Sequence, residues 1–288
     1  MVQQSRRHHF IPQFFSKLWT GKDRKLCEYS RPHEQLITHR KPPKAVGFEY
    51  DLYSLPGALP EHRTFLEDEF FSIGDQRACD ALQVLLGGKP DHLSTELRAA
   101  FTRLLTSFYH RTPERVSHIR ESLARGTERV IEETREEFRT GIHEALPPDV
   151  DFEQIAKNSL QETRDFSWGL SLVKLVNSDL LGPAIYSMRW IVRCLDRSDH
   201  DLLTGDHPLI GSNGFAHAQG HIALPLGPKL LFLATHNAAT EREILKQTDG
   251  QIVRNANRET LRHAKRFVYA TGEQHAAFVD RRLGRTGW

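Results

Sequence analysis

The chain has 288 residues, of which 39 are basic and 37 acidic, and 39% of its side chains are hydrophobic. This hydrophobic share is sufficient for a core and excludes a predominantly disordered chain. No stretch approaches the roughly 18 to 20 apolar residues of a membrane span, and the chain starts with a basic Arg-Arg-His-His segment where a signal peptide would be apolar. We therefore expect a cytoplasmic protein with no membrane partner.

The three cysteines, Cys27, Cys79 and Cys194, are odd in number and far apart, and they show no C-x-x-C spacing. This pattern indicates neither a disulfide framework nor a thiolate zinc site, so we expect reduced thiols. Charge is more informative by segment, because residues 1–44 carry +7 and residues 251–288 carry +5, which leaves −10 for the middle. If the fold joins the two ends, they form a positive surface suited to phosphates. The alternative is two solvated basic ends without a ligand.

The predicted elements change character along the chain. The segments LCEYS and QLITH, separated by Arg31-Pro32-His33, predict a small hairpin, and YDLYSL predicts one more short strand. After Pro60 the 3.6-residue spacing of apolar residues predicts helices, one of them ending at Thr112-Pro113, which opens the next. That helix is expected to continue to about Ala145, and another is expected from Asp151 to about Val176.

Beyond Gly182-Pro183 the apolar period falls to two, which predicts strands. We expect strands at residues 186–194, 221–226, 229–235 and 266–270, with a helix at 240–264 between the last two. The fold class is therefore α+β, with a mostly helical middle and a small, largely antiparallel sheet built mainly from the C-terminal third. We expect one unit over residues 1–288, divided into a basic segment with the hairpin (1–60), a helical region (61–180) and the sheet with its C-terminal helix (181–288).

The densest chemical signal is the N-terminal run Arg6-Arg7-His8-His9-Phe10-Ile11-Pro12. Neighbouring side chains of a strand point to opposite faces, so His8 and His9 reach one ligand only from an irregular backbone, which Pro12 could fix. Imidazoles bind metals and act as general acid and base on a phosphodiester. The alternative is one histidine bonded into the core and the other at the surface.

Two further positions stand out. Arg111 follows Phe108 by three residues, so its guanidinium continues the apolar face of its helix and needs an anionic partner, either a substrate phosphate or an internal carboxylate such as Glu67 or Asp206. The loop Thr204-Gly205-Asp206-His207-Pro208 can present Asp206 and His207 together as ligands or as an oriented acid–base pair. An Asp in such a loop also commonly forms an ordinary Asx turn.

The common signatures of nucleotide hydrolases, dinucleotide-binding proteins, zinc proteases and α/β-hydrolases are missing from the sequence. The segments RHHFIPQFFSKLW, YDLYSL, HRTPE, LLTGDHPLI, ALPLGPKLLFLA and NANRETLRHAKRFVYA together resemble the bacterial domain-of-unknown-function family numbered 4238. The resemblance implies one family-length unit. It places His8, His9, Arg111, Asp206, Pro208 and Asn257 at signature positions of that family.

This chain departs from the family pattern twice. The loop typically reads Ser-Asp-Asn-Pro in the family, where this chain has Gly205-Asp206-His207-Pro208, and Leu-Ser-Pro is here Leu226-Gly227-Pro228. The first departure puts in doubt any role for a side chain at position 205. The family name supplies no reaction, so the resemblance indicates which residues matter and leaves their chemistry open.

The leading hypothesis is a hydrolase acting on nucleic acid, nuclease-like and of the kind used in toxin or phage-defence systems. Its catalytic groups would be His8, His9, Arg111 and Asp206, and its partner would be nucleic acid or another phosphate-bearing ligand. A divalent metal ion is a candidate cofactor. The residues expected to bind substrate are Arg7, His207 and Asn257.

Two alternatives remain open. One is a non-enzymatic binding or interaction protein in which the histidines, Arg111 and Asp206 form a buried structural network. The other is a hydrolase of small phosphorylated or acylated metabolites, which needs a deep closed pocket. RNA or DNA specificity, metal dependence and oligomeric state do not follow from the sequence.

Overall fold

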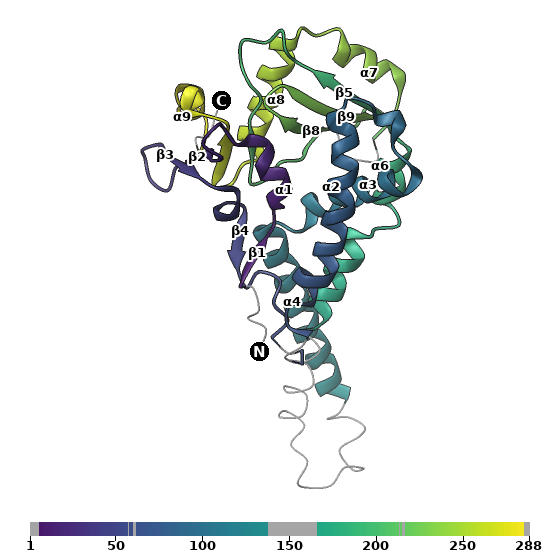
Figure 1. Ribbon diagram of the computed structural model, residues 1–288. Helices are drawn as coiled ribbons and strands as arrows, with labels where there is room; N and C mark the ends of the chain where they lie inside the picture. Colours follow the sequence, from purple (N-terminus) through teal and green to yellow (C-terminus); the bar gives the residue numbers. More distant parts are fainter. Residues whose placement is uncertain are drawn as a thin grey trace.

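The fold is that of a computed structural model, which describes residues 6–56, 58–59, 62–137, 166–212, 214 and 217–284 (Figure 1). The α+β class is confirmed, since a mostly helical middle is combined with small antiparallel sheets. The expected helix at 151–176 lies partly outside the described residues, and its described part, 166–176, is helical. No helix in the described ranges is both long and apolar enough to span a membrane.

The helical region begins with a π-helical turn, η4 (Leu66–Phe71), which continues directly into α2 (Ser72–Leu86). A short 3-10 turn, η5 (Pro90–His92), then leads to α3 (Thr95–His110), whose first turn is capped by the Ser94 hydroxyl accepting a hydrogen bond from the Leu97 N–H. The apolar stripe predicted for α3 is buried against α2 and the C-terminal sheet. This helix therefore anchors the middle of the chain to its end.

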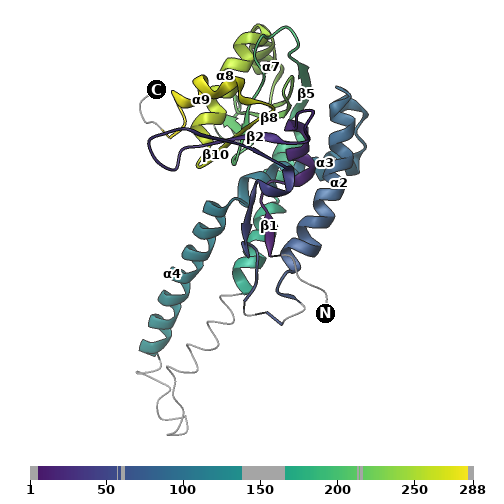
Figure 2. The same ribbon diagram turned by 60° about the vertical axis from the view of Figure 1, so that its left-hand side comes forward.

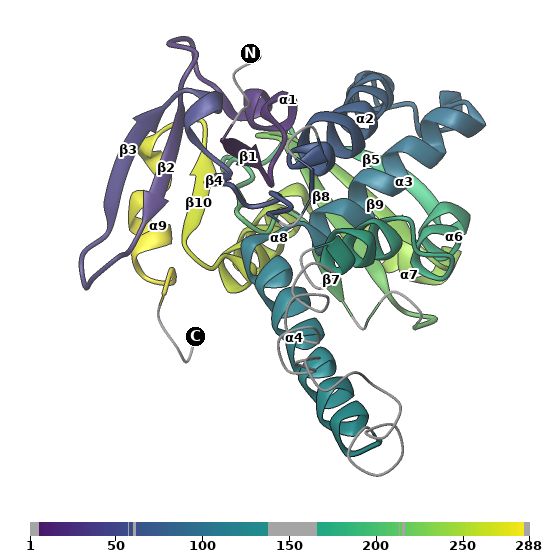
Figure 3. The same cartoon turned by 90° about the horizontal axis from the view of Figure 1, so that it is seen from below.

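The helix α4 (Pro113–Glu137) follows α3 after a sharp break and projects away from the body of the molecule (Figures 2 and 3). The predicted start at Thr112-Pro113 is confirmed. The expected continuation to Ala145 lies outside the described residues. A short helix, α6 (Leu181–Ser187), precedes the C-terminal strands.

Within the described residues the strands form three sheets, and each pairing among them is antiparallel. The smallest sheet pairs β1 (Arg7–His9) with β4 (Phe48–Tyr50). The second has the order β3 (Ile37–Lys41), β2 (Leu26–Ser30), β10 (Phe267–Ala270) and β6 (Thr204–Gly205). The third has the order β5 (Arg189–Cys194), β9 (Leu230–Thr235), β8 (His221–Gly227) and β7 (Ile210–Ser212).

The N-terminal and C-terminal parts of the chain meet in the second sheet, where β2 lies beside β10 and Ser30 pairs with Phe267 (Figure 3). The hairpin expected near residues 25–39 is β2–β3. Its cations are largely neutralised, because Arg31 pairs with Asp280, Arg40 with Asp23 and Lys41 with Glu28. These three cations of the hairpin are therefore each bonded to a carboxylate.

Three predicted elements have different boundaries in the structure. The YDLYSL segment is a turn after its first residue, since β4 ends at Tyr50 and Asp51 has a φ of 56°. The strand expected from Tyr186 begins at Arg189, because α6 occupies the preceding residues. The helix expected over 240–264 is two helices, α7 (Ala238–Leu245) and α8 (Asp249–His263), because Thr248 caps a new N-terminus through a capping box with Gln251.

The main core lies between α3 and the third sheet, where aromatic rings of different elements meet edge to face. Phe101 of α3 lies 5.2 Å from the ring of Phe232 and 5.8 Å from that of Trp190. A smaller core lies between α8, β2 and β10 and is closed by α9 (Ala276–Asp280). The remaining short helices are α1 (Gln13–Ser16), η1 (Lys17–Trp19), η2 (Pro43–Ala45) and η7 (Glu273–His275).

Candidate functional site

The two N-terminal histidines have different surroundings. The side chain of His8 is fully buried, and its Nδ1 accepts a hydrogen bond of 2.8 Å from the backbone N–H of Tyr53. Its ring stacks on the Tyr53 ring at 5.7 Å with an angle of 11° between the planes. His8 therefore holds the turn after β4 against β1, a structural position away from any open surface.

The alternation of side chains along β1 turns His9 the other way. Its backbone N–H donates to Oε1 of Glu67 at 3.2 Å, and its Nε2 is buried with no hydrogen-bond partner. Burial lowers the pKa of His9, and the positive charges of Arg111 and Arg7 lower it further, although a backbone hydrogen bond at Lys44 opposes this. The ring is therefore a neutral imidazole near pH 7, able to accept a proton.

Glu67 lies in the π-helical turn η4, a type of turn frequently found at functional sites. Its Oε1 accepts the His9 N–H, whereas its Oε2 is buried without a partner. Burial raises the pKa of Glu67 to about 7, against the opposing effects of the His9 N–H and the positive charge of Arg111. The carboxyl is therefore divided between its acid and base forms near neutral pH, as a general acid or base requires.

Arg111 points inward, as its spacing predicts, and its side chain is 0% exposed. Its Nε donates to the Phe10 carbonyl at 2.8 Å, and its Nη1 donates to the two carboxylate oxygens of Asp75 at 3.0 and 3.3 Å. The partner is thus an internal carboxylate, as one of the two alternatives predicted, but it is Asp75 and neither Glu67 nor Asp206. The guanidinium also lies 5.1 Å from the centre of the Phe71 ring, and its Nη2 has no partner.

His9, Glu67 and Asp75 line one open cleft with a volume of about 450 Å³ between α1, η4 and α2. Gln13, Ser72, Gln76 and Cys79 complete its polar lining. Two residues of this lining carry buried atoms without hydrogen-bond partners, His9 Nε2 and Glu67 Oε2, and a third such atom, Nη2 of Arg111, belongs to the side chain bonded to Asp75. Buried polar atoms in native proteins almost always have partners, so their concentration here indicates a site prepared for a ligand or for chemistry.

Asp206 belongs to a different hydrogen-bond network. Its carboxylate accepts the backbone N–H groups of Lys265, Arg266 and Phe267 at 2.6 to 3.0 Å. These bonds hold the turn between α8 and β10 against β6, a structural use of the acidic loop. The expected meeting of Asp206 with Arg111 is therefore not found, because each side chain is bonded to other groups.

His207, Asn257 and Arg7 also lie apart from the cleft's lining. His207 is placed between two carboxylates, with Nδ1 3.4 Å from Asp206 and Nε2 3.5 Å from Glu114. The Asn257 amide is buried and joins α8 to the loop before β6. It accepts a hydrogen bond from the Leu203 N–H at 2.7 Å and donates one to the Asp201 carbonyl at 2.9 Å. The exposed Arg7 lies over the Phe48 ring at 5.1 Å.

Sequence reasoning named Glu67 only as a partner for Arg111 and did not single out Asp75. The signal that could have found both is their spacing, because residues eight apart lie about two helical turns apart on a similar face. Within the described part of the chain, no group of three or more His, Cys, Asp or Glu side chains is arranged to hold a metal ion. The divalent metal considered above stays a prediction.

One family profile matches the chain, and it covers residues 7–274. It is described as a protein of unknown function (DUF4238), in agreement with the resemblance seen in the sequence motifs. Comparison with curated proteins and with solved structures found no match.

Proposed function

Because the chain belongs to the DUF4238 family over nearly its whole length, we propose one activity for this family-length unit, the acid–base hydrolysis of nucleic acid in the His9–Glu67 cleft. The observation that carries the proposal is the pairing of two incompletely bonded titratable groups. Glu67 has a pKa of about 7 and lies beside His9, whose pKa is lowered by burial. A carboxylic acid and a neutral imidazole in one cleft supply a proton donor and a proton acceptor at the same pH.

In the proposed reaction, a water molecule attacks the phosphorus atom of a phosphodiester. His9 Nε2 takes the proton of this water as the new P–O bond forms. The protonated Glu67 carboxyl gives its proton to the leaving oxygen as the other P–O bond breaks. The products are a phosphate monoester and a free hydroxyl, after which a proton returns from the imidazolium to Glu67 through solvent.

Arg111 and Asp75 act as positioning residues in this proposal. The guanidinium is sealed from solvent and bonded to Phe10 and Asp75, so it is behind the wall of the cleft. Its charge lowers the pKa of Glu67 from the higher value that burial alone would give. It also compensates the charge of Asp75 and so reduces the repulsion between this carboxylate and an anionic substrate.

The test is a cleavage assay on single- and double-stranded RNA and DNA, with Mg²⁺, with Mn²⁺ and with EDTA. The Glu67→Gln variant keeps the size of the side chain and removes its proton exchange, so we expect the rate to fall by about 100-fold or more. Glu69→Gln is the matched control, because Glu69 is an exposed carboxylate on the same turn. Absence of cleavage by the wild-type protein on all four substrates under every metal condition would contradict the proposal.

A second candidate, a non-enzymatic interaction protein, is favoured by the burial of His8, Arg111, Asp206 and Asn257, whose side chains hold backbone groups in place. Removing a buried polar partner leaves the bonded group unsatisfied, at a cost of about 1 to 3 kcal/mol for each group. His8→Ala and Asp206→Ala should both lower the melting temperature. Only the hydrolase proposal also requires Glu67→Gln to change an activity while the protein stays folded.

A further inference from the structure

Two adjoining hollows follow the helix α8 and share the side chains of His200 and Arg254. The first has a volume of about 430 Å³ and lies at the start of α8, and the second has about 400 Å³ and lies between α8 and α9. We call the two together the α8 groove. Its arginines are Arg193, Arg197, Arg254, Arg258, Arg281 and Arg282.

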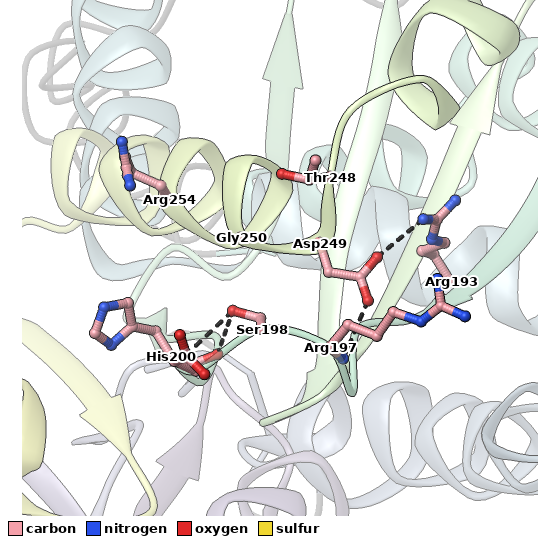
Figure 4. Close-up of a pocket in the computed structure, with 9 residues that line it drawn as sticks. Arg193, Arg197, Ser198, His200, Thr248, Asp249, Gly250 and Arg254 are labelled. Carbon is pink, nitrogen blue, oxygen red and sulfur yellow. Dashed lines mark hydrogen bonds and ion pairs between the residues drawn. The ribbon is translucent and has the colours of Figure 1, made fainter.

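The first hollow is partly neutralised by acidic side chains. In Figure 4 the Asp249 carboxylate at the start of α8 is held between the Arg193 guanidinium, at 2.9 Å, and the backbone N–H of Arg197, at 3.2 Å. In Figure 4, Arg254 and His200 lie away from this pair. Both also line the second hollow, and none of the described residues that line it is a carboxylate.

Three arginines of the second hollow differ from the cations of the β2–β3 hairpin. Within the described ranges, Arg254, Arg258 and Arg281 form no ion pair, although Arg254 and Arg258 are one turn apart on α8 and exposed. The cations of the N-terminal hairpin, by contrast, are bonded to carboxylates. The α8 groove therefore gathers six arginines, and at least three of them are not neutralised by a carboxylate of the described residues.

Two further observations favour an anionic ligand in this hollow. Burial lowers the pKa of Arg282, and the positive charges of Arg258 and Arg281 lower it further, so the fold holds like charges close together. His275 lines the same hollow with its side chain only 6% exposed, and its Nε2 is buried without a hydrogen-bond partner. A phosphate group would compensate the arginines and could supply the acceptor or donor that the imidazole lacks.

We propose that the α8 groove binds the phosphate backbone of a single-stranded nucleic acid. A strand can enter a hollow and follow two of them in sequence, whereas a membrane surface cannot. Phe278 adds an aromatic ring to the second hollow, and proteins that hold single strands commonly combine a basic groove with aromatic side chains. The inference rests on the proposed function for the choice of nucleic acid as the polyanion, and it gives that substrate a binding surface separate from the His9–Glu67 cleft.

The test measures the anisotropy of a labelled single-stranded 20-mer, as DNA and as RNA, in EDTA at several salt concentrations. The groove variant is Arg254→Ala with Arg258→Ala and Arg281→Ala. The matched control is Arg77→Ala with Arg125→Ala and Arg242→Ala, which removes the same charge from exposed positions on α2, α4 and α7. Unchanged melting temperatures establish that both variants are folded.

We expect the groove variant to bind the strand at least about tenfold more weakly and to lose roughly two from the slope of log K against log salt. The control should change the affinity by less than about twofold. Equal weakening by both variants, or the absence of strand binding by the wild-type protein, would overturn the inference. A third outcome would also overturn it. If the wild-type protein binds no strand but binds phosphatidylserine vesicles, and the groove variant loses that vesicle binding, the groove is a membrane site.

The two proposals fail in different ways. Glu67→Gln should keep the wild-type affinity for the 20-mer, since Glu67 does not line the groove. A protein that binds strands through the groove but cleaves none contradicts the proposed hydrolysis and supports the groove. If the groove variant cleaves nucleic acid at the wild-type rate and binds the strand with the wild-type affinity, the result supports the proposed hydrolysis and contradicts the groove.

Discussion

At the level of single residues, the cleft consists of polar atoms whose hydrogen-bonding capacity the fold does not use. His9 Nε2 and Glu67 Oε2 are both buried without partners, and the carboxyl has a pKa of about 7. Such groups reduce the stability of the folded state, since burial disfavours the charged form of a carboxyl. The cost is measurable, because it depends on pH.

Glu67→Gln tests this cost directly. The pKa of the carboxyl rises from 4.5 to about 7 on folding, so the folded state binds more protons than the unfolded state between these values. Below about pH 4.5 the protonated Glu67 carboxyl makes its full contribution to the free energy of unfolding of the wild-type protein. This contribution is lost as the pH rises, and the loss levels off above pH 7. Glutamine cannot ionise, so the stability of the variant relative to wild type should increase by about 3 kcal/mol from pH 4 to pH 8.

Urea unfolding at several pH values checks this expectation, with Glu69→Gln as the control. The exposed Glu69 should leave the pH dependence of the wild-type protein unchanged. A constant difference between Glu67→Gln and wild type across the whole pH range would mean that Glu67 titrates near its ordinary pKa in the folded protein.

Residue-level prediction from the sequence succeeded where the spacing along one element decides the outcome. The position of Arg111 after Phe108 on α3 predicted its burial, and β-strand alternation predicted different surroundings for His8 and His9. The partner of Arg111 could not be predicted, because the contact with Asp75 depends on how α2 packs on α3. The same holds for Asp206, whose partners are backbone groups some sixty residues later.

At the level of elements, the turn before β4 determines where β1 lies. The Gly47 carbonyl accepts the N–H groups of Phe10 and Ile11 at 2.9 and 3.0 Å. These bonds fix the segment whose Phe10 carbonyl accepts from Arg111. Gly47 has a φ of +62°, and a Cβ placed there would lie 2.7 Å from the Ile11 Cβ.

Gly47→Ala should therefore destabilise the protein by about 2 to 4 kcal/mol, because the new methyl group clashes and the backbone is strained. Urea unfolding measures this effect, and Gly126→Ala in α4 is the control. A Cβ at Gly126 meets nothing within 4 Å, so alanine should raise the stability by up to about 1 kcal/mol. Equal stabilities of Gly47→Ala and wild type would show that this turn adapts and does not fix β1.

Element boundaries show which sequence signals are local. The start of α4 followed from Thr112-Pro113. The strands expected at 221–226 and 229–235, the second of them nearly all apolar, are found at 221–227 and 230–235. The break between α7 and α8 was missed because the apolar spacing continues across it, although Thr248 and Gln251 form a capping box there. That pair of residues was the available signal.

At the level of the whole molecule, the chain brings its two ends together and keeps its two candidate surfaces on different elements. The pairing of β2 with β10 joins residues about 240 positions apart, which no local pattern in one sequence can predict. The basic character of both ends was visible in the composition, but the pairing of the hairpin cations with carboxylates was not. The α8 groove carries a group of arginines, and the cleft carries Glu67 and His9 with shifted pKa values.

The pH profile of nucleic-acid cleavage tests the central claim most directly, because it links the shifted pKa of Glu67 to the chemistry. We expect kcat/KM of the wild-type protein to fall above an apparent pKa near 7, as Glu67 loses the proton that the leaving oxygen needs. This decline should be absent from the residual activity of Glu67→Gln and unchanged in Glu69→Gln. A profile for Glu67→Gln with the same shape and rate as wild type would contradict the account.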